Sequence, residues 1–161
     1  MKRIFTFIIV LCLVLTGMLT IIPMKEIDDD KMNCSGTRAT LVVGSGQAYS
    51  TVTAAIAAAN PGDIIRVYDG TYNEKFTVDK TLTIIGNGST STIINGDNSI
   101  APIHITANWV NVSKLKVQNG WLTSPAGGIY MASENSTVSD CNVTSNYRGF
   151  TIWSYNNTVR N

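Results

Sequence analysis

The carboxyl-terminal third of this 161-residue chain repeats itself at a fixed spacing. A shift of 21 residues superimposes Gly128 on Gly149, Ile129 on Phe150, Met131 on Ile152, Asn135 on Asn156, Thr137 on Thr158 and Val138 on Val159. The preceding segment matches at 26 residues, pairing Ile103 with Ile129, Ile105 with Met131, Val112 with Val138, Leu115 with Cys141 and Val117 with Val143. A period near 21 with one five-residue insertion, between Val117 and Gly128, predicts stacked coils that cannot bury their apolar faces singly.

Apolar and polar residues alternate within each unit, as in Ile103-His104-Ile105 and Phe150-Thr151-Ile152. This period of two indicates short strands with one buried face. We therefore expect an all-β parallel solenoid from about Ile64 onward, with about 21 residues per coil. The register predicts two interior columns and one outward column: Ile103, Ile129 and Phe150; Ile105, Met131 and Ile152; and, facing outward, His104, Tyr130 and Thr151.

Asparagine recurs at one turn of the repeat, at Asn135 and Asn156. Stacked amides there can hydrogen-bond along the solenoid as a ladder. Asparagine also tolerates the left-handed backbone of a turn. The two interpretations are compatible, and both stay open at this point.

A short helix is predicted before the repeats. Val52, Ala55, Ile56 and Ala59 recur at helical spacing, with Ser50 as the N-cap and Pro61-Gly62 ending the helix, which then spans residues 50–60. Its place directly before the first strand suits a cap over the open apolar end of the solenoid.

The first residues are typical of an export signal. Lys2 and Arg3 precede an uncharged run over residues 4–22, and acidic residues follow. The run lies between a signal-peptide core and a membrane-spanning helix in length, so residues 1–24 are either a cleaved signal peptide or an uncleaved signal anchor that contacts the membrane. Residues 25–40 are then a polar linker and 41–161 the β-helix domain, outside the cytoplasm on the cell surface, in the periplasm or in the extracellular space.

Composition excludes other classes of protein. Lys and Arg number 12 against 11 Asp and Glu, and no basic stripe occurs, so nucleic-acid binding is not expected. Outside the apolar run the cysteines are Cys34 and Cys141, which are too few for a disulfide framework. Asn, Ser and Thr make up 47 of the 161 residues, which favours turns and a surface of amides and hydroxyls.

From Val42 to Asn161 the sequence resembles the start of a right-handed parallel β-helix of the pectate-lyase-like superfamily. The stretch YSTVTAAIAAANPGDIIRVYDGTYNEKFTVDKTLTIIGNG and the repeat GGIYMASENSTVSDCNVTSN carry this resemblance. They are similar to the amino-terminal coil of pectinesterases, NosD-type periplasmic copper-binding proteins and many surface proteins. The resemblance implies the fold more specifically than an activity, because sites are grafted onto solenoids.

Catalytic groups are not evident in the sequence. Polysaccharide-cleaving members of the superfamily cluster carboxylates on one sheet, whereas Asp63, Asp69, Asp79, Asp97 and Asp140 are scattered and typical of turns. Pectinesterases have an acidic residue near the place held here by Tyr147-Arg148-Gly149. Gly149 occupies the position where that general acid would be, so the resemblance does not imply esterase activity for this chain. His104 is the single histidine, and Met131 and Cys141 are expected in the core, so no metal and no cofactor is expected.

Aromatic residues supply the candidate binding site. Trp121 lies in the inserted loop, and Tyr130, Trp153 and His104 are expected on the outer surface. Exposed aromatic faces stack on sugar rings and are favoured at interfaces. Trp121 has a second interpretation, as a hydrophobic plug folded over the edge of the solenoid.

Glycosylation is a further candidate modification. Asn-x-Ser/Thr sequons begin at Asn33, Asn87, Asn111, Asn135, Asn142 and Asn156. They are either glycosylation sites or a by-product of a repeat rich in Asn and Thr.

The sequence as a whole predicts an exported surface β-helix with a structural, adhesive or carbohydrate-binding role and a polysaccharide or other glycan as partner. The alternative is the amino-terminal part of a carbohydrate-active enzyme, a lyase, hydrolase or pectinesterase, with its catalytic residues beyond Asn161. Because Asn161 falls in mid-strand of the repeat, we expect further coils, or another chain, to cover the open carboxyl-terminal end.

Overall fold

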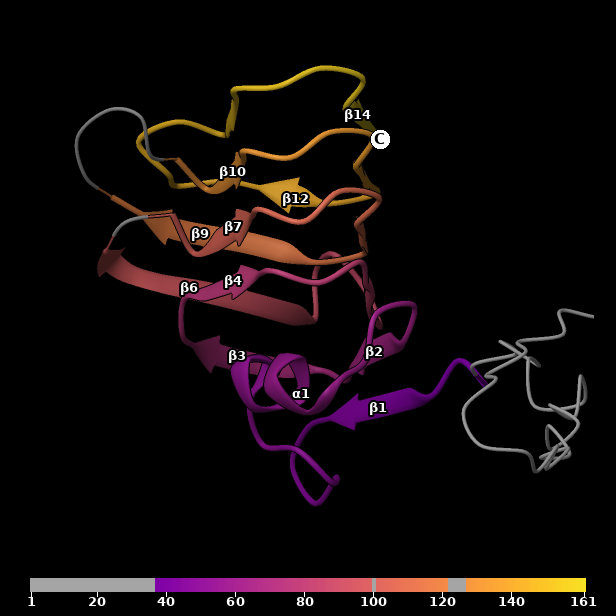
Figure 1. Cartoon of the computed structure of the whole chain (residues 1–161). Helices are drawn as coiled ribbons and strands as arrows, with labels where there is room; N and C mark the ends of the chain where they lie inside the picture. Colours follow the sequence, from indigo (N-terminus) through magenta and orange to yellow (C-terminus); the bar gives the residue numbers. More distant parts are fainter. Residues whose placement is uncertain (1–36, 100, 122–126) are drawn as a thin grey trace, which may run out of the picture. The chain divides into compact units, whose positions relative to one another are not determined.

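Parallel strands wind into a solenoid with three faces. The computed structural model describes residues 37–99, 101–121 and 127–161. Every strand pairing in this part of the chain is parallel. The chain passes from sheet A to sheet B to sheet C in each coil, and the coils stack from the indigo end of the domain to the yellow end (Figure 1).

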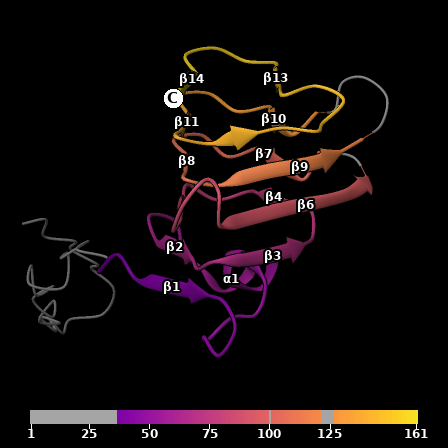
Figure 2. The same cartoon turned by 180° about the vertical axis from the view of Figure 1, so that it is seen from behind.

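Three sheets make up the faces, and their strands lie in the following order. Sheet A contains β1 (Thr40–Val43), β2 (Ile64–Val67), β5 (Thr83–Gly86), β8 (Asn111–Ser113), β11 (Thr137–Ser139) and β14 (Thr158–Arg160). Sheet B contains β3 (Gly70–Asn73), β6 (Thr92–Ser99), β9 (Lys116–Gly120) and β12 (Asn142–Val143). Sheet C contains β4 (Phe76–Val78), β7 (Ile103–Ile105), β10 (Ile129–Met131) and β13 (Phe150–Ile152). Figure 2 shows sheet B, with β3, β6, β9 and β12 side by side.

The predicted register is confirmed. Ile129 pairs with Ile103 on one side and with Phe150 on the other, and Met131 pairs in the same way with Ile105 and Ile152. In sheet A the buried side chains of Ile65, Ile84, Val112 and Val138 form an equivalent column. The solenoid was expected to begin at about Ile64. It begins earlier, because strand β1 precedes that residue and pairs with β2.

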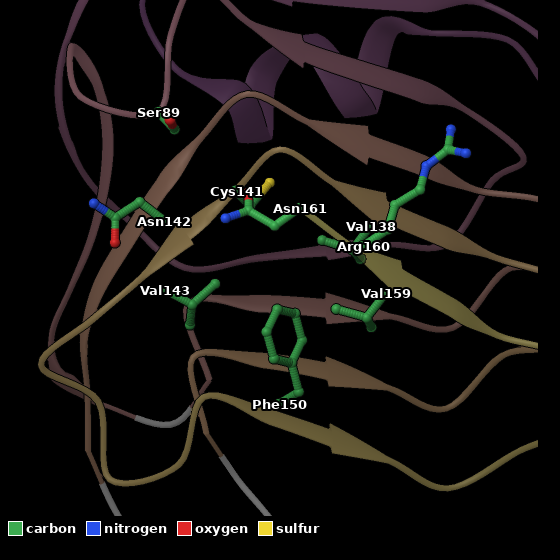
Figure 3. A pocket seen from close by; sticks show the side chains of 9 residues that line it. All are labelled: Ser89, Val138, Cys141, Asn142, Val143, Phe150, Val159, Arg160 and Asn161. Carbon is green, nitrogen blue, oxygen red and sulfur yellow. The ribbon is translucent and has the colours of Figure 1, made fainter.

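The last coil departs from the expected burial. Ile152 stands in an interior column but is 45% exposed, and Phe150 is half-buried. No described strand pairs with the outer edge of β13 or β14. A hollow of about 740 Å³ lies at this end, and Figure 3 shows Val143, Phe150 and Val159 gathered around it. The columns therefore lose their cover at the last coil, because burial in a solenoid comes from the neighbouring coil.

An asparagine ladder is present, but it runs across the strands of sheet B and not at the predicted turn. The Asn95 side-chain amide donates to Asn73 Oδ1 at 2.6 Å, and the Asn119 amide donates to Asn95 Oδ1 at 2.8 Å. Asn135 and Asn156 form no such side-chain bonds in the described structure; each has a φ of 58°. The left-handed interpretation is thus confirmed for these two residues, and the ladder interpretation is wrong for them.

Helix α1 (Val52–Ala58) covers the amino-terminal end of the solenoid, close to β1 and β2 (Figure 1). Its N-cap is Thr51, whose hydroxyl accepts from Ala54 N at 3.2 Å, rather than Ser50 as predicted. Val52, Ala55 and Ile56 are buried against the core. The helix ends at Ala58 rather than at residue 60, because Asp63 Oδ2 accepts from Asn60 N and fixes the turn that follows.

Two charged side chains from the first coil hold the ends of α1. The Glu74 carboxylate accepts hydrogen bonds from Val52 N and Thr53 N, at 2.8 and 3.0 Å. The Lys80 ammonium donates to the carbonyls of Ile56, Ala57 and Ala59, at 2.9, 3.1 and 2.8 Å. Both charges oppose the partial charge of the helix end that they contact. A helix of seven residues is too short to be stable alone, so these contacts help to fix the cap.

We predict that Lys80→Met destabilises the domain, because three carbonyl groups at the end of α1 lose their donor. The free energy of unfolding should fall by about 2 kcal/mol, the scale of a hydrogen bond to a charged group. Chemical denaturation of the full chain measures this. Lys75→Met is the matched control, since Lys75 is exposed. Equal midpoints for the two variants would contradict the capping role of Lys80.

Candidate functional site

The outer face of sheet C carries one column of side chains from four successive coils. Register pairs Thr77 with His104, His104 with Tyr130 and Tyr130 with Thr151. Their neighbours in each strand point into the core, so the four side chains point away from it. Thr77 is exposed, and His104 and Tyr130 are half-buried. The outward placement predicted for His104 and Tyr130 is confirmed by this register.

Thr151 differs from the prediction in its burial. It lies in the outward column but is only 8% exposed. Its Oγ1 is buried and has no hydrogen-bond partner, and the same holds for His104 Nε2. A buried polar atom without a partner costs free energy that most native structures avoid. Two buried polar atoms beneath the outer face therefore have no hydrogen-bond partner among the described residues.

The imidazole of His104 stacks on the ring of Tyr130. The ring centroids are 4.7 Å apart and the planes make an angle of 21°. Burial lowers the pKa of His104, because the cationic form loses hydration. At neutral pH the column therefore presents an uncharged heteroaromatic ring.

A second aromatic pair lies at the corner between sheets B and C. Trp121 contacts Tyr147 edge to face, with ring centroids 6.2 Å apart at 65°, and the Arg148 guanidinium lies 5.9 Å from the Tyr147 ring centroid. Asn146 fixes this corner, since its Oδ1 accepts from Gly120 N at 2.7 Å and its amide donates to Val117 O at 2.9 Å. Trp121 is 56% exposed, which contradicts the interpretation as a buried plug.

The repeat insertion begins at this corner. Gly120 O accepts from Tyr147 N, and Arg148 O accepts from Gly128 N, so the two coils are in register on both sides of the inserted residues. The insertion identified Trp121 in the sequence, but its contact with Tyr147 was missed, as was the contact of Tyr147 with Arg148. Tyr147 and Arg148 could have been found from the repeat alignment, because they lie one coil after the insertion and opposite it.

Trp153 follows β13 and lies at the other border of sheet C. Its backbone N–H donates to Met131 O at 3.0 Å, and its side chain is exposed, as predicted. No ring contact joins it to another described aromatic residue. The structure thus brings His104 and Tyr130 together, places Trp121 beside Tyr147, and leaves Trp153 separate from both pairs.

Most of the aspartates with described contacts or geometry lie outside the strands, at turns. Asp63 Oδ1 accepts from Ala39 N, Asp69 Oδ1 accepts from Ser91 Oγ, and Asp140 has a positive φ between β11 and β12. Asp97 differs, because it lies within β6, where it has a positive φ at the irregular register. Within residues 37–99, 101–121 and 127–161, no three His, Cys, Asp or Glu side chains are grouped so that they could hold a metal ion.

Met131 is fully buried, and Cys141 is a free thiol that packs partly buried against the core. Burial raises the pKa of the Cys141 thiol. Both residues therefore occupy the structural positions that the repeat alignment predicted.

The apolar run over residues 4–22, Cys34 and the sequon at Asn33 lie outside the described residues. None of the helices within the described ranges has the length and hydropathy needed to cross a membrane. Asn87, Asn111 and Asn156 are exposed, while Asn135 and Asn142 are half-buried; glycosylation at all five stays a prediction.

Solved pectin methylesterases have a similar fold. The enzyme from carrot matches with a TM-score of 0.61 and 22% identity, over 74% of this chain and 43% of the carrot chain. The Aspergillus niger enzyme in deglycosylated form matches with a TM-score of 0.59 and 19% identity, over 74% and 47%. A pectin methylesterase in complex with a hexasaccharide matches with a TM-score of 0.53 and 17% identity, over 74% and 45%.

These likenesses establish the fold as a right-handed parallel β-helix like that of the pectin methylesterases, as predicted. The chain spans less than half the length of these enzymes. No family model matches the sequence, and no curated protein matches it.

We predict that acidification destabilises the domain through His104. Because burial lowers the pKa of this group in the folded state, the unfolded chain binds a proton first as the pH falls below about 6.5. Stability should therefore fall between that pH and the lower pKa of the folded state. Thermal melts of the full chain and of His104→Gln over this range measure the effect. The variant should lack this loss, and parallel pH profiles would contradict the assignment to His104, the chain's single histidine.

Proposed function

We propose that this chain is an exported β-helix domain that binds carbohydrate through the outer face of sheet C. The observation that carries the proposal is the exposed Trp121–Tyr147 pair at the border of a face on which His104 and Tyr130 stack. Aromatic rings offer apolar surfaces to the C–H faces of sugars at a low entropic cost. Export rests on the signal-like residues 1–24, which deliver the domain to the surface or the periplasm.

The charge beside the exposed aromatic pair fits the same ligand class. Arg148 adds a cation beside Tyr147, which suits a carboxylate-bearing sugar. A hexasaccharide is bound by one protein of the same fold, which supports a glycan as partner. A structural or adhesive role at the cell surface follows from binding without turnover.

A carbohydrate-active enzyme is the second candidate, favoured by the pectin methylesterase fold. The chain spans less than half the length of those enzymes, and on this candidate the catalytic residues lie in further coils. Within the described chain, Asp140 lies at a left-handed turn between sheets A and B, away from the outer face of sheet C. Gly149 supplies no acid beside Arg148.

We expect Trp121→Ala to weaken oligosaccharide binding about tenfold, the loss of one stacking contact, with an unchanged melting temperature. Calorimetric titration of the full chain with hexagalacturonate and with cellohexaose measures the affinity. Tyr68→Ala is the control, because Tyr68 is an exposed aromatic residue in the turn after β2. An unchanged affinity in Trp121→Ala, or a stability loss of about 3 kcal/mol as for a buried aromatic, would refute the binding role.

Methanol release from methyl-esterified pectin distinguishes the two candidate functions. We expect the full chain to release none above the uncatalysed rate, because no acid stands at residue 149 and no carboxylate lies in the outward column. Turnover that Asp140→Asn abolishes would show that the enzyme interpretation is correct. Asp97→Asn is the control. Asp97 also has a left-handed backbone, but it lies within β6 of sheet B, whereas Asp140 lies at the turn between β11 and β12.

A further inference from the structure

The corner that joins sheet C to sheet A repeats in three coils. Register places Trp109, Asn135 and Asn156 at the same position, two residues before β8, β11 and β14. All three have a left-handed backbone, with φ values of 61°, 58° and 58°. Hydrogen bonds run between the coils here, from Trp109 N to Glu134 O and from Asn135 N to Tyr155 O. The three positions are therefore equivalent in backbone geometry.

Trp109 has an unfavourable backbone conformation at this position, and its side chain is not packed in the core. A bulky residue at positive φ is a conformational outlier, whereas Asn adopts this region at a low cost. Trp109 is also 63% exposed, so its ring adds little burial to offset that cost. The asparagines of the next two coils make the same turn with less strain. Within the folded domain, the indole therefore provides no stabilisation that Asn would not provide.

The surroundings of Trp109 combine exposed aromatic rings with amides and hydroxyls. Trp153 and Tyr155, from the last coil, are exposed at the same corner, and with Trp109 they form what we call the corner surface. Asn108 Oδ1 accepts from Glu134 N at 2.8 Å, and Asn157 Oδ1 accepts from Ser136 N at 2.9 Å. These bonds tie the three coils together and so fix where the rings stand.

Free positive charge is nearly absent from this corner. In the segments 106–110, 132–136 and 153–157 the charged residue is Glu134. The coil before Trp109 adds Asp79 and Lys80, and the Lys80 ammonium already donates to three carbonyls at the end of α1. A phosphate, a uronate or a nucleic acid would therefore meet carboxylates there and a cation that is already bonded. An apolar protein partner would meet Asn108, Glu134 and Asn135 between the rings instead of a continuous apolar patch. Uncharged sugars, which offer apolar C–H faces and hydroxyl groups together, match both parts of the surface.

We propose that the corner surface of Trp109, Trp153 and Tyr155 is a binding site for an uncharged glycan. Trp109 stacks on one sugar ring, and the amides of the corner accept and donate hydrogen bonds to its hydroxyls. The site goes beyond the proposed outer-face site, since it depends on Trp109 rather than on Trp121, Tyr147, His104 or Tyr130. Trp153 borders both surfaces, so Trp109 is the residue that distinguishes the two sites.

The substitution Trp109→Asn tests this site, because it installs the residue that the next two coils carry. The melting temperature of the full chain should stay the same or rise, since Asn relieves the strained backbone. Titration with cellohexaose, xylohexaose and mannohexaose should show binding of at least one of them by the unmodified chain. The variant should bind that sugar about tenfold more weakly, the factor that corresponds to one lost stacking contact. Tyr68→Asn, at a distant exposed ring, should leave the affinity unchanged.

Five outcomes would overturn the proposal. Equal affinities of the unmodified chain and of Trp109→Asn would remove Trp109 from the site, as would the absence of binding to all three uncharged hexasaccharides. The charge argument would be contradicted if hexagalacturonate bound more tightly than the uncharged hexasaccharides and Trp109→Asn weakened that binding. Self-association in sedimentation that Trp109→Asn abolishes would assign the surface to a second copy of the chain. Loss of binding in Trp121→Ala alone would leave the outer-face site standing and this one refuted.

Discussion

The backbone hydrogen bonds between successive coils are the interaction on which the rest of this domain depends. They hold the strands in exact parallel register, so that Ile103 meets Ile129 and Ile65 meets Ile84. Each apolar column is buried by the coils above and below it, since one coil has no interior of its own. The capped helix closes the stack at one end, where Glu74 and Lys80 hold it by both termini. At the other end Ile152 is exposed, and no described strand pairs with the outer edge of its strand.

The corners make this register possible, and they also decide which side chains reach solvent. A left-handed residue turns the chain from one sheet to the next, as Lys114 and Asp140 do between sheets A and B. Asn, Asp and Gly accept this conformation readily, so polar residues gather at corners for conformational reasons. A large aromatic residue at a corner is a departure from that rule. The backbone conformation of the corners therefore explains most of their polar residues, but it does not explain the exposed aromatic rings.

Periodicity predicted the fold well, because a repeat of 21 residues constrains register directly. The interior columns follow from alternation, and the aspartates at turns follow from their chemistry. The ladder of Asn73, Asn95 and Asn119 was missed, because the segments that carry it match the repeat poorly and one of them contains an irregular register between Asn95 and Ser99. The pairing of Trp121 with Tyr147 was missed for a different reason. Contacts across an insertion depend on where the inserted chain returns, and spacing alone does not encode that path.

Stability and binding are linked in the last coil. Thr151 and Trp153, which contribute to the outer face and its border, belong to the same coil as Phe150 and Val159, whose interior sides face the hollow at the end of the stack. Anything that stacks on β13 and β14 buries those apolar side chains and makes this coil more rigid. On the binding function proposed above, a ligand held by Trp153 contacts this same coil. A partner that orders the coil and a ligand that needs it ordered would then favour one another, by an amount that is equal in both directions.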